Sequence, residues 1–467
     1  MVEPLAVVVD DDAQQLGETV ASLNRLGFSV STFEAVGPAR EALSAVGSEV
    51  DLFVLDRKLP MQRGETAVDE LGDLLFWEVS ASHPDSRIIV FSGYTDFDHL
   101  QEVTAKSGSL EFGFGDRLDR VSVYKKQQTD LFDRAVAELS SAIKQINRIA
   151  VMSDPRPCSL QVRALRRVAA HYGGTSIRAE VLSGGLTQAV VWRCSIADAE
   201  HVLASVIVKV SASAPTPNGI QELLPHSLVA SRLATVRGAM FGSVASVLQI
   251  AGPEPVSLFD VLKESNGSSL PVIEQLRLGM DSALPAGERR DVRLVDLLPP
   301  VIQPDRLQSV LEGLGVPTPD LDLWVPTTFR MSHLDFHGGN VLVCDGAPVV
   351  IDSEDSGFAS SVVDPLVMLM SSWIHPDSAY FGGPWPAEDA TTEEFCGDTF
   401  VSGSPDPAFY GELVDWIQDR TTSPREFWGL VLAYGTRQTT FPNVQKSPLS
   451  LRRLTNLVRF AAERLAD

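Results

Sequence analysis

Residues 332–352 read SHLDFHGGNVLVCDGAPVVID, and their pattern predicts the architecture of the larger part of the chain. An Asp-Gly pair separates two short apolar runs here, which is the pattern of a β-hairpin with a tight turn. A short hairpin folds back on itself, so we expect Asp352 at its end to lie close to Asn340 at its beginning. Asp335 precedes Asn340 by five residues and lies on the loop that enters the hairpin.

These residue types predict a site for phosphoryl transfer. An asparagine and an aspartate held together near the phosphates of ATP are suitable ligands for Mg²⁺, a hard cation that prefers oxygen. A second aspartate on the same loop can orient or deprotonate an attacking hydroxyl group. We therefore expect Asn340 and Asp352 to hold the metal and Asp335 to act on the acceptor.

The order His-x-Asp, four residues, Asn, and then Ile-Asp after the hairpin resembles the aminoglycoside phosphotransferase and choline kinase branch of the protein-kinase-like fold. The segment 182–191, which contains Gly184-Gly185, resembles the nucleotide loop of the same family. The resemblance implies a bilobal α+β phosphotransferase domain over 158–467, with an N-lobe at about 158–252 and a C-lobe at about 253–467. It also implies ATP and Mg²⁺ as cofactors.

Three further residues, Lys209, Glu222 and Asp364, belong to the expected phosphotransferase domain. Lys209 is a lysine inside the apolar run 206–210, either an edge-strand residue that reaches solvent or the residue that holds nucleotide phosphates. The resemblance implies that Lys209, Gly184 and Gly185 contact the nucleotide. Glu222, on the helix expected next, either pairs with Lys209 or is a solvated glutamate at a helix start. Asp364 is expected to begin a structural helix.

The first 150 residues predict a different domain. Apolar runs at 5–9, 52–55, 88–91 and 121–124 alternate with helical stretches, which indicates βαβ units around a parallel sheet. In such sheets the functional site lies beyond the carboxyl ends of the strands. The polar residues at those ends are Asp10, Asp11, Asp56, Ser92 and Lys125.

Three carboxylates at one sheet edge repel one another unless a cation such as Mg²⁺ lies among them. The pattern resembles the receiver domain of two-component response regulators, an α/β doubly wound, flavodoxin-like fold. That resemblance implies Asp56 as phosphoacceptor, with Asp10, Asp11 and Asp56 around the Mg²⁺. It also implies Ser92 as the switch hydroxyl, Lys125 as the phosphate partner, and a sensor histidine kinase or other phosphodonor as partner.

The receiver domain is expected over 1–150. The step from Ser92 to Lys125 is longer than receiver domains usually show, and the glycine-rich stretch 108–115 is expected to supply the extra length near the face that usually signals. Helical periodicity over 129–149 predicts the last receiver helix, and a proline-containing break at 153–157 leads us to expect the domain boundary at 150–157.

Composition narrows the function classes. The 61 acidic against 38 basic residues give a net charge of -23, which disfavours nucleic acid as a partner. The chain start shows no signal-peptide pattern, and the apolar segment 366–374 is too short to insert across a membrane. The four scattered cysteines suggest no disulfide framework, so a cytoplasmic location is expected.

The sequence thus predicts a receiver-regulated, ATP- and Mg²⁺-dependent phosphotransferase in bacterial signal transduction, which acts on a hydroxyl-bearing acceptor, a small molecule or a protein. The alternative is a non-catalytic nucleotide-binding adaptor in a two-component or conflict system. The intact set of Lys209, Asp335, Asn340 and Asp352 favours turnover over that alternative. An antibiotic phosphotransferase acting on aminoglycosides is less favoured, because such enzymes rarely need a receiver.

Overall fold

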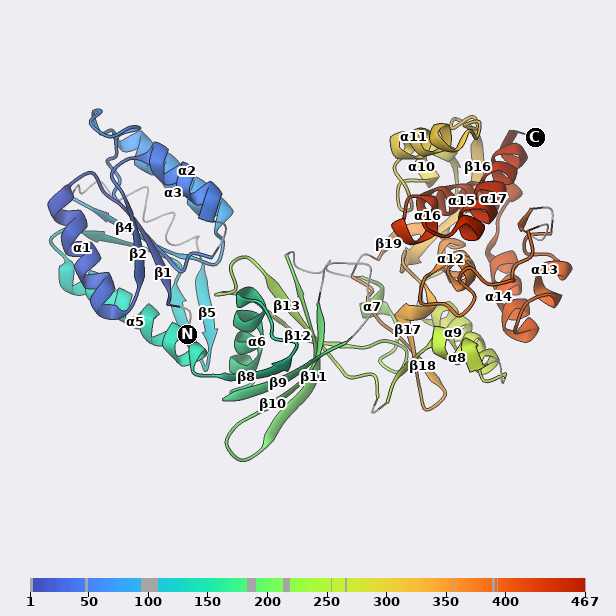
Figure 1. The fold of residues 1–467 in the computed structure, drawn as a ribbon, viewed down its shortest axis with the longest axis horizontal. Coiled ribbons are helices and arrows are strands. Elements are labelled where there is room, and N and C mark those ends of the chain that lie inside the picture. Colours follow the sequence, from blue (N-terminus) through green and yellow to red (C-terminus); the bar gives the residue numbers. More distant parts are fainter. Residues whose placement is uncertain are drawn as a thin grey trace. The chain divides into compact units, whose positions relative to one another are not determined.

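The structure is a computed structural model that describes residues 3–46, 49–93, 108–182, 190–212, 219–252, 254–264, 267–354, 356–388, 391–392 and 394–466 (Figure 1). The chain divides into two compact units. The first unit is Met1–Ala214 with Arg232–Ile250, and the second is Pro215–Ser231 with Ala251–Asp467.

The first sheet of the first unit has five parallel strands in the order β2-β1-β3-β4-β7. The strands are β1 (Leu5–Val9), β2 (Ser29–Phe33), β3 (Leu52–Leu55), β4 (Arg87–Ser92) and β7 (Val121–Lys125). The helices around it are α1 (Ala13–Leu26), α2 (Val36–Val46), α3 (Asp69–Ser82) and α5 (Thr129–Asn147). Side chains of α1 and α5 share one buried cluster with the sheet, and those of α2 and α3 share another. The predicted doubly wound parallel sheet is confirmed, and we call the part of the chain from β1 to α5 the receiver-like domain.

A small antiparallel hairpin stands apart from this sheet, in the stretch expected to hold the extra length. Its strands are β5 (Ser109–Gly113) and β6 (Asp116–Asp119). Leu110 and Phe112 of β5 are buried in the same cluster as α1 and α5. Gly113 has a φ of +90°, a conformation that glycine adopts without steric cost. The hairpin is therefore anchored in the core of the receiver-like domain.

The second sheet of the first unit has six strands in the order β12-β13-β11-β10-β9-β8. They are β8 (Ala150–Asp154), β9 (Ser176–Val181), β10 (Val191–Ala197), β11 (Val202–Ser211), β12 (Arg232–Val236) and β13 (Val244–Leu248). All pairings are antiparallel except that of β8 with β9. Helix α6 (Ser159–His171) packs its apolar side on one face of this sheet (Figure 1). The predicted boundary at 150–157 thus falls where the chain has already joined the second sheet.

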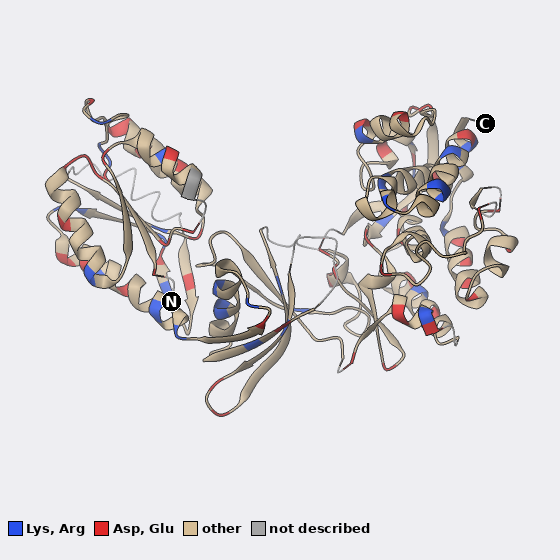
Figure 2. Ribbon diagram, viewed as in Figure 1, with Lys and Arg blue, Asp and Glu red and all other residues tan. Residues whose placement is uncertain are grey.

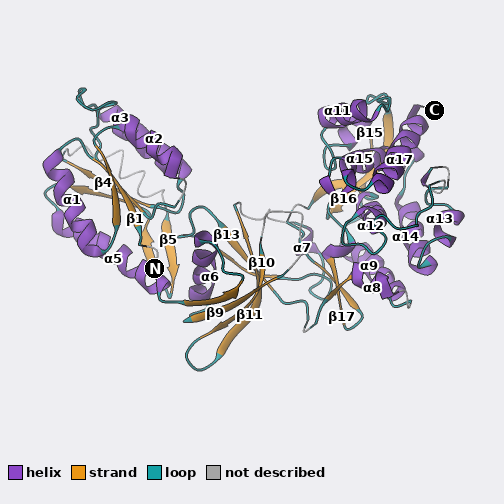
Figure 3. Cartoon of the chain, viewed as in Figure 1, coloured by secondary structure: helices purple, strands orange, loops and turns teal. Residues whose placement is uncertain are grey.

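The second unit combines two three-stranded sheets with a helical core (Figure 3). The sheets are β14 (Val256–Ser257) with β17 (Val341–Cys344) and β18 (Ala347–Val350), and β15 (Glu288–Arg293) with β16 (Trp324–Ser332) and β19 (Gly357–Ser360). The helices are α7 (Ile220–Leu223), α8 (Leu258–Glu264), α9 (Ser269–Ala283), α10 (Leu294–Leu297), α11 (Pro304–Leu314), α12 (Val363–Ile374), α13 (Asp398–Ser402), α14 (Pro407–Arg420), α15 (Pro424–Thr439), α16 (Pro442–Gln445) and α17 (Pro448–Ala466).

Helix α12 is buried along its whole length and forms the centre of this core. It contains the apolar segment that the sequence marked as too short to span a bilayer. Among the helices of the described ranges, none combines the length and the apolar character that a membrane crossing needs. The apolar character of α12 is explained by its burial against α14, α15 and the 3-10 turn Gly338–Asn340, which leaves no face of the helix exposed to solvent.

Candidate active site and phosphoacceptor site

The loop 332–340 of the second unit ties two of the predicted catalytic residues together. The side-chain Nδ2 of Asn340 donates to the backbone oxygen of Asp335 at 2.8 Å and lies 3.4 Å from its carboxylate Oδ2. A single 3-10 turn, Gly338–Asn340, closes the loop. Because the Asn340 amide nitrogen is used in this bond, its amide oxygen is directed elsewhere and is suited to a metal ion.

The hairpin forms where the sequence predicts it, with Val341 of β17 opposite Val350 of β18. Its turn residues Asp345 and Gly346 have φ values of +51° and +78°. The backbone N–H of Ile351 then donates to the carbonyl of Asn340 at 2.9 Å. Asp352 is the next residue, so the hairpin brings its backbone close to that of Asn340. A metal site shared by these two residues requires this closeness.

A buried carboxylate fixes the backbone immediately before Asp335. Oδ2 of Asp364 accepts from the His333 N–H at 2.8 Å, and Oδ1 accepts from the Leu334 N–H at 3.0 Å. Leu334 has a φ of +69°, which costs about 1 kcal/mol for a residue with a side chain. Burial raises the pKa of Asp364, and the two N–H donors oppose that rise. Asp364 therefore holds a strained loop in place from the start of α12.

His333 makes a second tie across the site, because its Nε2 lies 2.8 Å from the carbonyl oxygen of Ile351. This contact joins the loop that carries Asp335 to the segment that carries Asp352. His333 is fully buried, and the contact uses its ring for structure. The two acidic residues are thus linked through backbone on both sides of the hairpin.

Three stacked rings flank Asp335. The ring centroids of His337 and His375 are 4.6 Å apart, and Phe259 stacks on His375 at 5.1 Å. Burial lowers the pKa of His337 to about 4, so the ring is neutral at pH 7. Its Nδ1 accepts from the Gly339 N–H at 3.1 Å, which leaves the proton on Nε2, 3.6 Å from Oδ2 of Asp335. The neutral ring can therefore present an N–H to the carboxylate.

Lys209 lies in the first unit, on β11, opposite Val191 of β10 and Ser246 of β13. Val206 and Val208 of the same strand are buried in the cluster with α6. Because strand residues alternate between faces, Lys209 lies on the face of the sheet that α6 does not cover.

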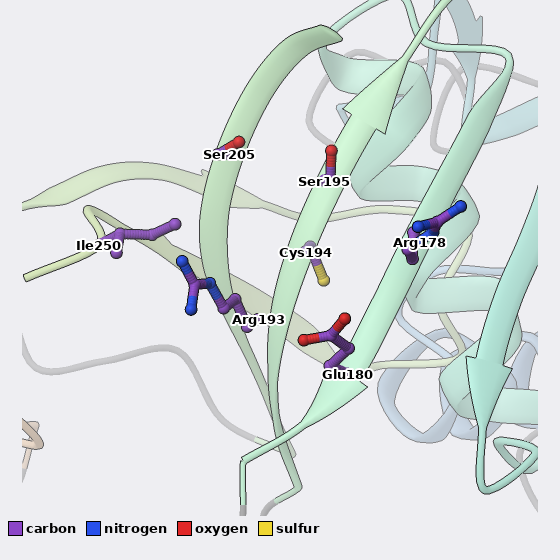
Figure 4. Close-up of a pocket in the computed structure, with 7 residues that line it drawn as sticks. All are labelled: Arg178, Glu180, Arg193, Cys194, Ser195, Ser205 and Ile250. Atoms are coloured by element: carbon purple, nitrogen blue, oxygen red, sulfur yellow. The ribbon is translucent and has the colours of Figure 1, made fainter. Parts of the chain in front are cut away.

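The same uncovered face is hollowed beside β9 and β10, and Figure 4 shows the residues that line the hollow. They include Arg178, Glu180, Arg193, Ser195 and Ile250. Lys209 is not among the residues that line this hollow. Gly184 and Gly185 lie outside the described residues. Glu222 lies exposed on α7 in the second unit, whereas Lys209 belongs to the first.

The receiver-like domain brings its three predicted carboxylates together. One carboxylate oxygen from each of Asp10, Asp11 and Asp56 lies within 4.8 Å of the others, at the carboxyl ends of β1 and β3. Burial raises the pKa of Asp10 to about 6, and burial followed by the charge of Asp56 raises that of Asp11. Oxygen ligands at this spacing, with an excess of negative charge, fit a hard divalent cation.

The structure places Lys126 on this cluster, whereas the sequence predicts that its neighbour Lys125 is the phosphate partner. The Lys126 ammonium lies 2.6 Å from Oδ2 of Asp56 and 2.8 Å from Oδ2 of Asp10. Burial lowers the pKa of Lys126, but its hydrogen bonds to the two aspartates outweigh burial and raise it. Neighbouring residues at a strand end point in opposite directions, so a displacement of one residue decides which ammonium reaches the site.

Ser92 ends β4 opposite Lys125. It is buried, and its hydroxyl finds no hydrogen-bond partner within the described ranges. Its carbonyl accepts from the Lys126 N–H at 3.1 Å, which places Ser92 next to the lysine of the cluster.

The chain is similar to receiver domains in one part and to choline-kinase-like proteins in a larger part, the fusion that the motifs predict. A response regulator receiver domain protein from Methanospirillum hungatei is 21% identical over 31% of this chain and 98% of its own, with a TM-score of 0.23. A choline/ethanolamine kinase family protein from Mesorhizobium loti is 13% identical over 62% of this chain and 92% of its own, with a TM-score of 0.33.

A third structure is the amicoumacin kinase hAmiN in complex with AMP-PNP, Ca²⁺ and Ami, which is 14% identical over 60% of this chain and 87% of its own, with a TM-score of 0.32. No protein-family model and no curated protein matches the sequence.

Proposed function

We propose that the chain is a receiver-regulated phosphotransferase that uses ATP and Mg²⁺ to phosphorylate a hydroxyl group. One observation carries the proposal: Asn340 is bonded to Asp335 on one side and to Ile351, next to Asp352, on the other. A general acid-base carboxylate and two oxygen ligands for a metal are thus held on one tied segment.

In the proposed reaction, the acceptor oxygen forms a bond to the γ-phosphorus as the bond to the bridging oxygen of ADP breaks. Asp335 orients the acceptor hydroxyl and receives its proton, and the neutral His337 ring holds the Asp335 carboxylate in position. Asn340 and Asp352 would hold Mg²⁺, which when bound neutralises charge on the phosphate oxygens. Lys209 would contact the α- and β-phosphates.

Regulation is proposed to begin at Asp56. A sensor histidine kinase or another phosphodonor would phosphorylate Asp56, with Mg²⁺ held among Asp10, Asp11 and Asp56. Lys126 is the cation next to the new phosphoryl group, and Ser92 is the buried hydroxyl beside it. The added negative charge can then change the packing of the receiver-like domain.

Transfer of labelled phosphate tests the enzyme. The purified chain is incubated with γ-labelled ATP, Mg²⁺ and fractions of a cell extract, which supply small-molecule and protein acceptors. Asp335→Asn should reduce transfer by about 100-fold or more, the usual contribution of a general acid-base group. Asp345→Asn is the matched control, because Asp345 lies in the exposed hairpin turn where asparagine tolerates a positive φ.

Two outcomes would contradict the proposal. If the chain binds an ATP analogue but transfers no phosphate in any fraction, it is a nucleotide-binding adaptor. If Asp335→Asn and Asp345→Asn behave alike, the phosphate transfer does not use the predicted loop.

A further inference from the structure

The first unit contains an extensive contact between the receiver-like domain and the six-stranded sheet. The hairpin β5–β6 packs on α6, where the Phe114 N–H donates to the Ala170 carbonyl at 3.3 Å. A Cβ added to Gly113 would lie 2.5 Å from the Cβ of Ala170, so only glycine permits this approach. On the other side, the loop between β12 and β13 places Ala239 inside the buried cluster of the receiver-like domain.

Charged and polar groups reinforce this contact. Arg163 of α6 lies 2.7 Å from Asp51 of the receiver-like domain, and both side chains are at most one-tenth exposed. Asp85, in the turn before β4, accepts from the Met240 N–H at 3.3 Å and the Gly242 N–H at 3.0 Å. The buried pair of Arg163 and Asp51 is costly to break, because loss of one partner leaves the other charge buried without a counter-ion.

Helix α6 also holds the β12–β13 loop in place through hydrogen bonds. Arg167, which is 2% exposed, donates from Nε to the Gly238 carbonyl at 2.9 Å and from Nη2 to the Arg237 carbonyl at 3.0 Å. The basic residues of α6 are visible in Figure 2. The helix, the loop and the hairpin thus form one interlocked contact.

The contact is attached to the strands that carry the phosphoacceptor site, at their opposite ends. Asp51 precedes β3 and Asp56 follows it, so they are separated by about 16 Å of extended chain. Asp85 lies before β4, and Ser92 ends it. Phe91, next to Ser92, shares the buried cluster with β5 and Ala239.

On the other side the contact reaches the strand of Lys209. The β12–β13 loop leads directly into β13, where Ser246 pairs with Lys209. Helix α6 packs on Val206 and Val208, which lie on the same strand as Lys209. The receiver-like core is therefore connected to the Lys209 strand through the β12–β13 loop and through α6.

We infer that the hairpin β5–β6, helix α6 and the β12–β13 loop are the output contact through which the receiver state alters nucleotide binding at the six-stranded sheet. This inference rests on the proposed function for the identity of the nucleotide. In this proposal the surface stays docked in both states of the receiver-like domain. Nucleotide binding and the phosphoryl group at Asp56 then change each other's affinity by the same factor.

The experiment measures the affinity of the full chain for a non-hydrolysable ATP analogue with Mg²⁺, with and without beryllofluoride, which mimics an aspartyl phosphate. The affinity should change by about fivefold or more in the native chain and not in Asp56→Asn. Gly113→Ala should abolish the change. Gly115→Ala is the matched control, because Gly115 has a similar φ of +85° but no atom within 4 Å of an added Cβ.

A second measurement is hydrogen exchange of the segment 237–243, which should change when beryllofluoride is added. Asp85→Ala, which removes the acceptor of two loop amides, gives a second way to weaken the contact if Gly113→Ala does not fold. The inference is overturned if beryllofluoride alters neither affinity nor exchange, or if the affinity change survives in the contact variants. If the ATP analogue does not bind at all, the proposed function fails, and the exchange of 237–243 alone decides the inference.

Discussion

Replacing Asp364 with asparagine should slow phosphoryl transfer even though Asp364 touches no substrate in the proposed reaction. Both carboxylate oxygens accept backbone N–H groups, those of His333 and Leu334. An asparagine keeps one acceptor and turns its NH₂ toward the other N–H. The lost bond to a charged group costs about 1.5–3 kcal/mol, and a buried unpaired N–H adds about 1–3 kcal/mol. Removal of a buried charge offsets part of this, so we expect a net loss of about 3 kcal/mol in unfolding free energy.

The effect on catalysis follows from the strained backbone. Leu334 holds a φ of +69° only while Asp364 binds its N–H, so release of that bond lets the loop relax and displaces Asp335. A displacement of about 1 Å in a reacting group costs roughly 100-fold in rate. We therefore expect kcat to fall about 100-fold, with little change in KM for ATP.

The assay measures ATP turnover and urea unfolding for Asp364→Asn and for Asp406→Ala. Asp406 is also buried, but its bonds go to Ser269 and to the Phe409 N–H at the start of α14. Loss of this cap should destabilise the unit by about 1–2 kcal/mol and leave kcat unchanged. The reasoning is refuted if both variants lose turnover equally, or if Asp364→Asn turns over at the native rate.

Lys126 and His337 allow two further tests, one of ligand affinity and one of stability against pH. Lys126→Ala should weaken beryllofluoride binding by about tenfold, because the Lys126 ammonium contacts both Asp56 and Asp10. Lys125→Ala should change the same affinity by less than about twofold, and titration of both variants with beryllofluoride measures the two affinities. His337 has a pKa of about 4 in the folded chain against an ordinary 6.5, so the folded state favours the neutral ring, and stability present above pH 6.5 is lost as the pH falls toward 4. Between pH 7 and 4 the unfolding free energy, measured with urea, should fall by about 3 kcal/mol from this group. The fall should be smaller in His337→Asn and unchanged in the control His201→Gln, because His201 is exposed. An equal dependence of the unfolding free energy on pH in all three proteins would contradict the prediction.

Local patterns in the sequence were sufficient for several elements. The run 5–9 is β1 and the run 52–55 is β3, because strands covered on both faces are apolar along their length. The Asp-Gly pair predicts the turn of β17–β18, because both residues must adopt positive φ. The same hairpin explains why the chain returns to Asn340 just before Asp352, as predicted.

Contacts between distant segments could not be predicted in the same way. The choice between Lys125 and Lys126 depends on how the chain leaves β7, and both residues have the same side chain. The role of Asp364 was missed, although its place at the start of a helix was expected, because its partners lie about 30 residues earlier in the chain. Only the fold shows that α12 lies against the loop 332–340.

The position of β8 has a consequence for proteolysis between the domains and for their exchange during evolution. Helix α5 ends at Asn147 and β8 begins at Ala150, so the chain passes from one domain into the outer strand of the next sheet with no free tether. Cleavage in the predicted boundary would remove that strand and leave the backbone edge of β9 open to aggregation. Exchange of the receiver-like domain during evolution would therefore have to include β8, unlike exchange of domains that are joined by flexible linkers.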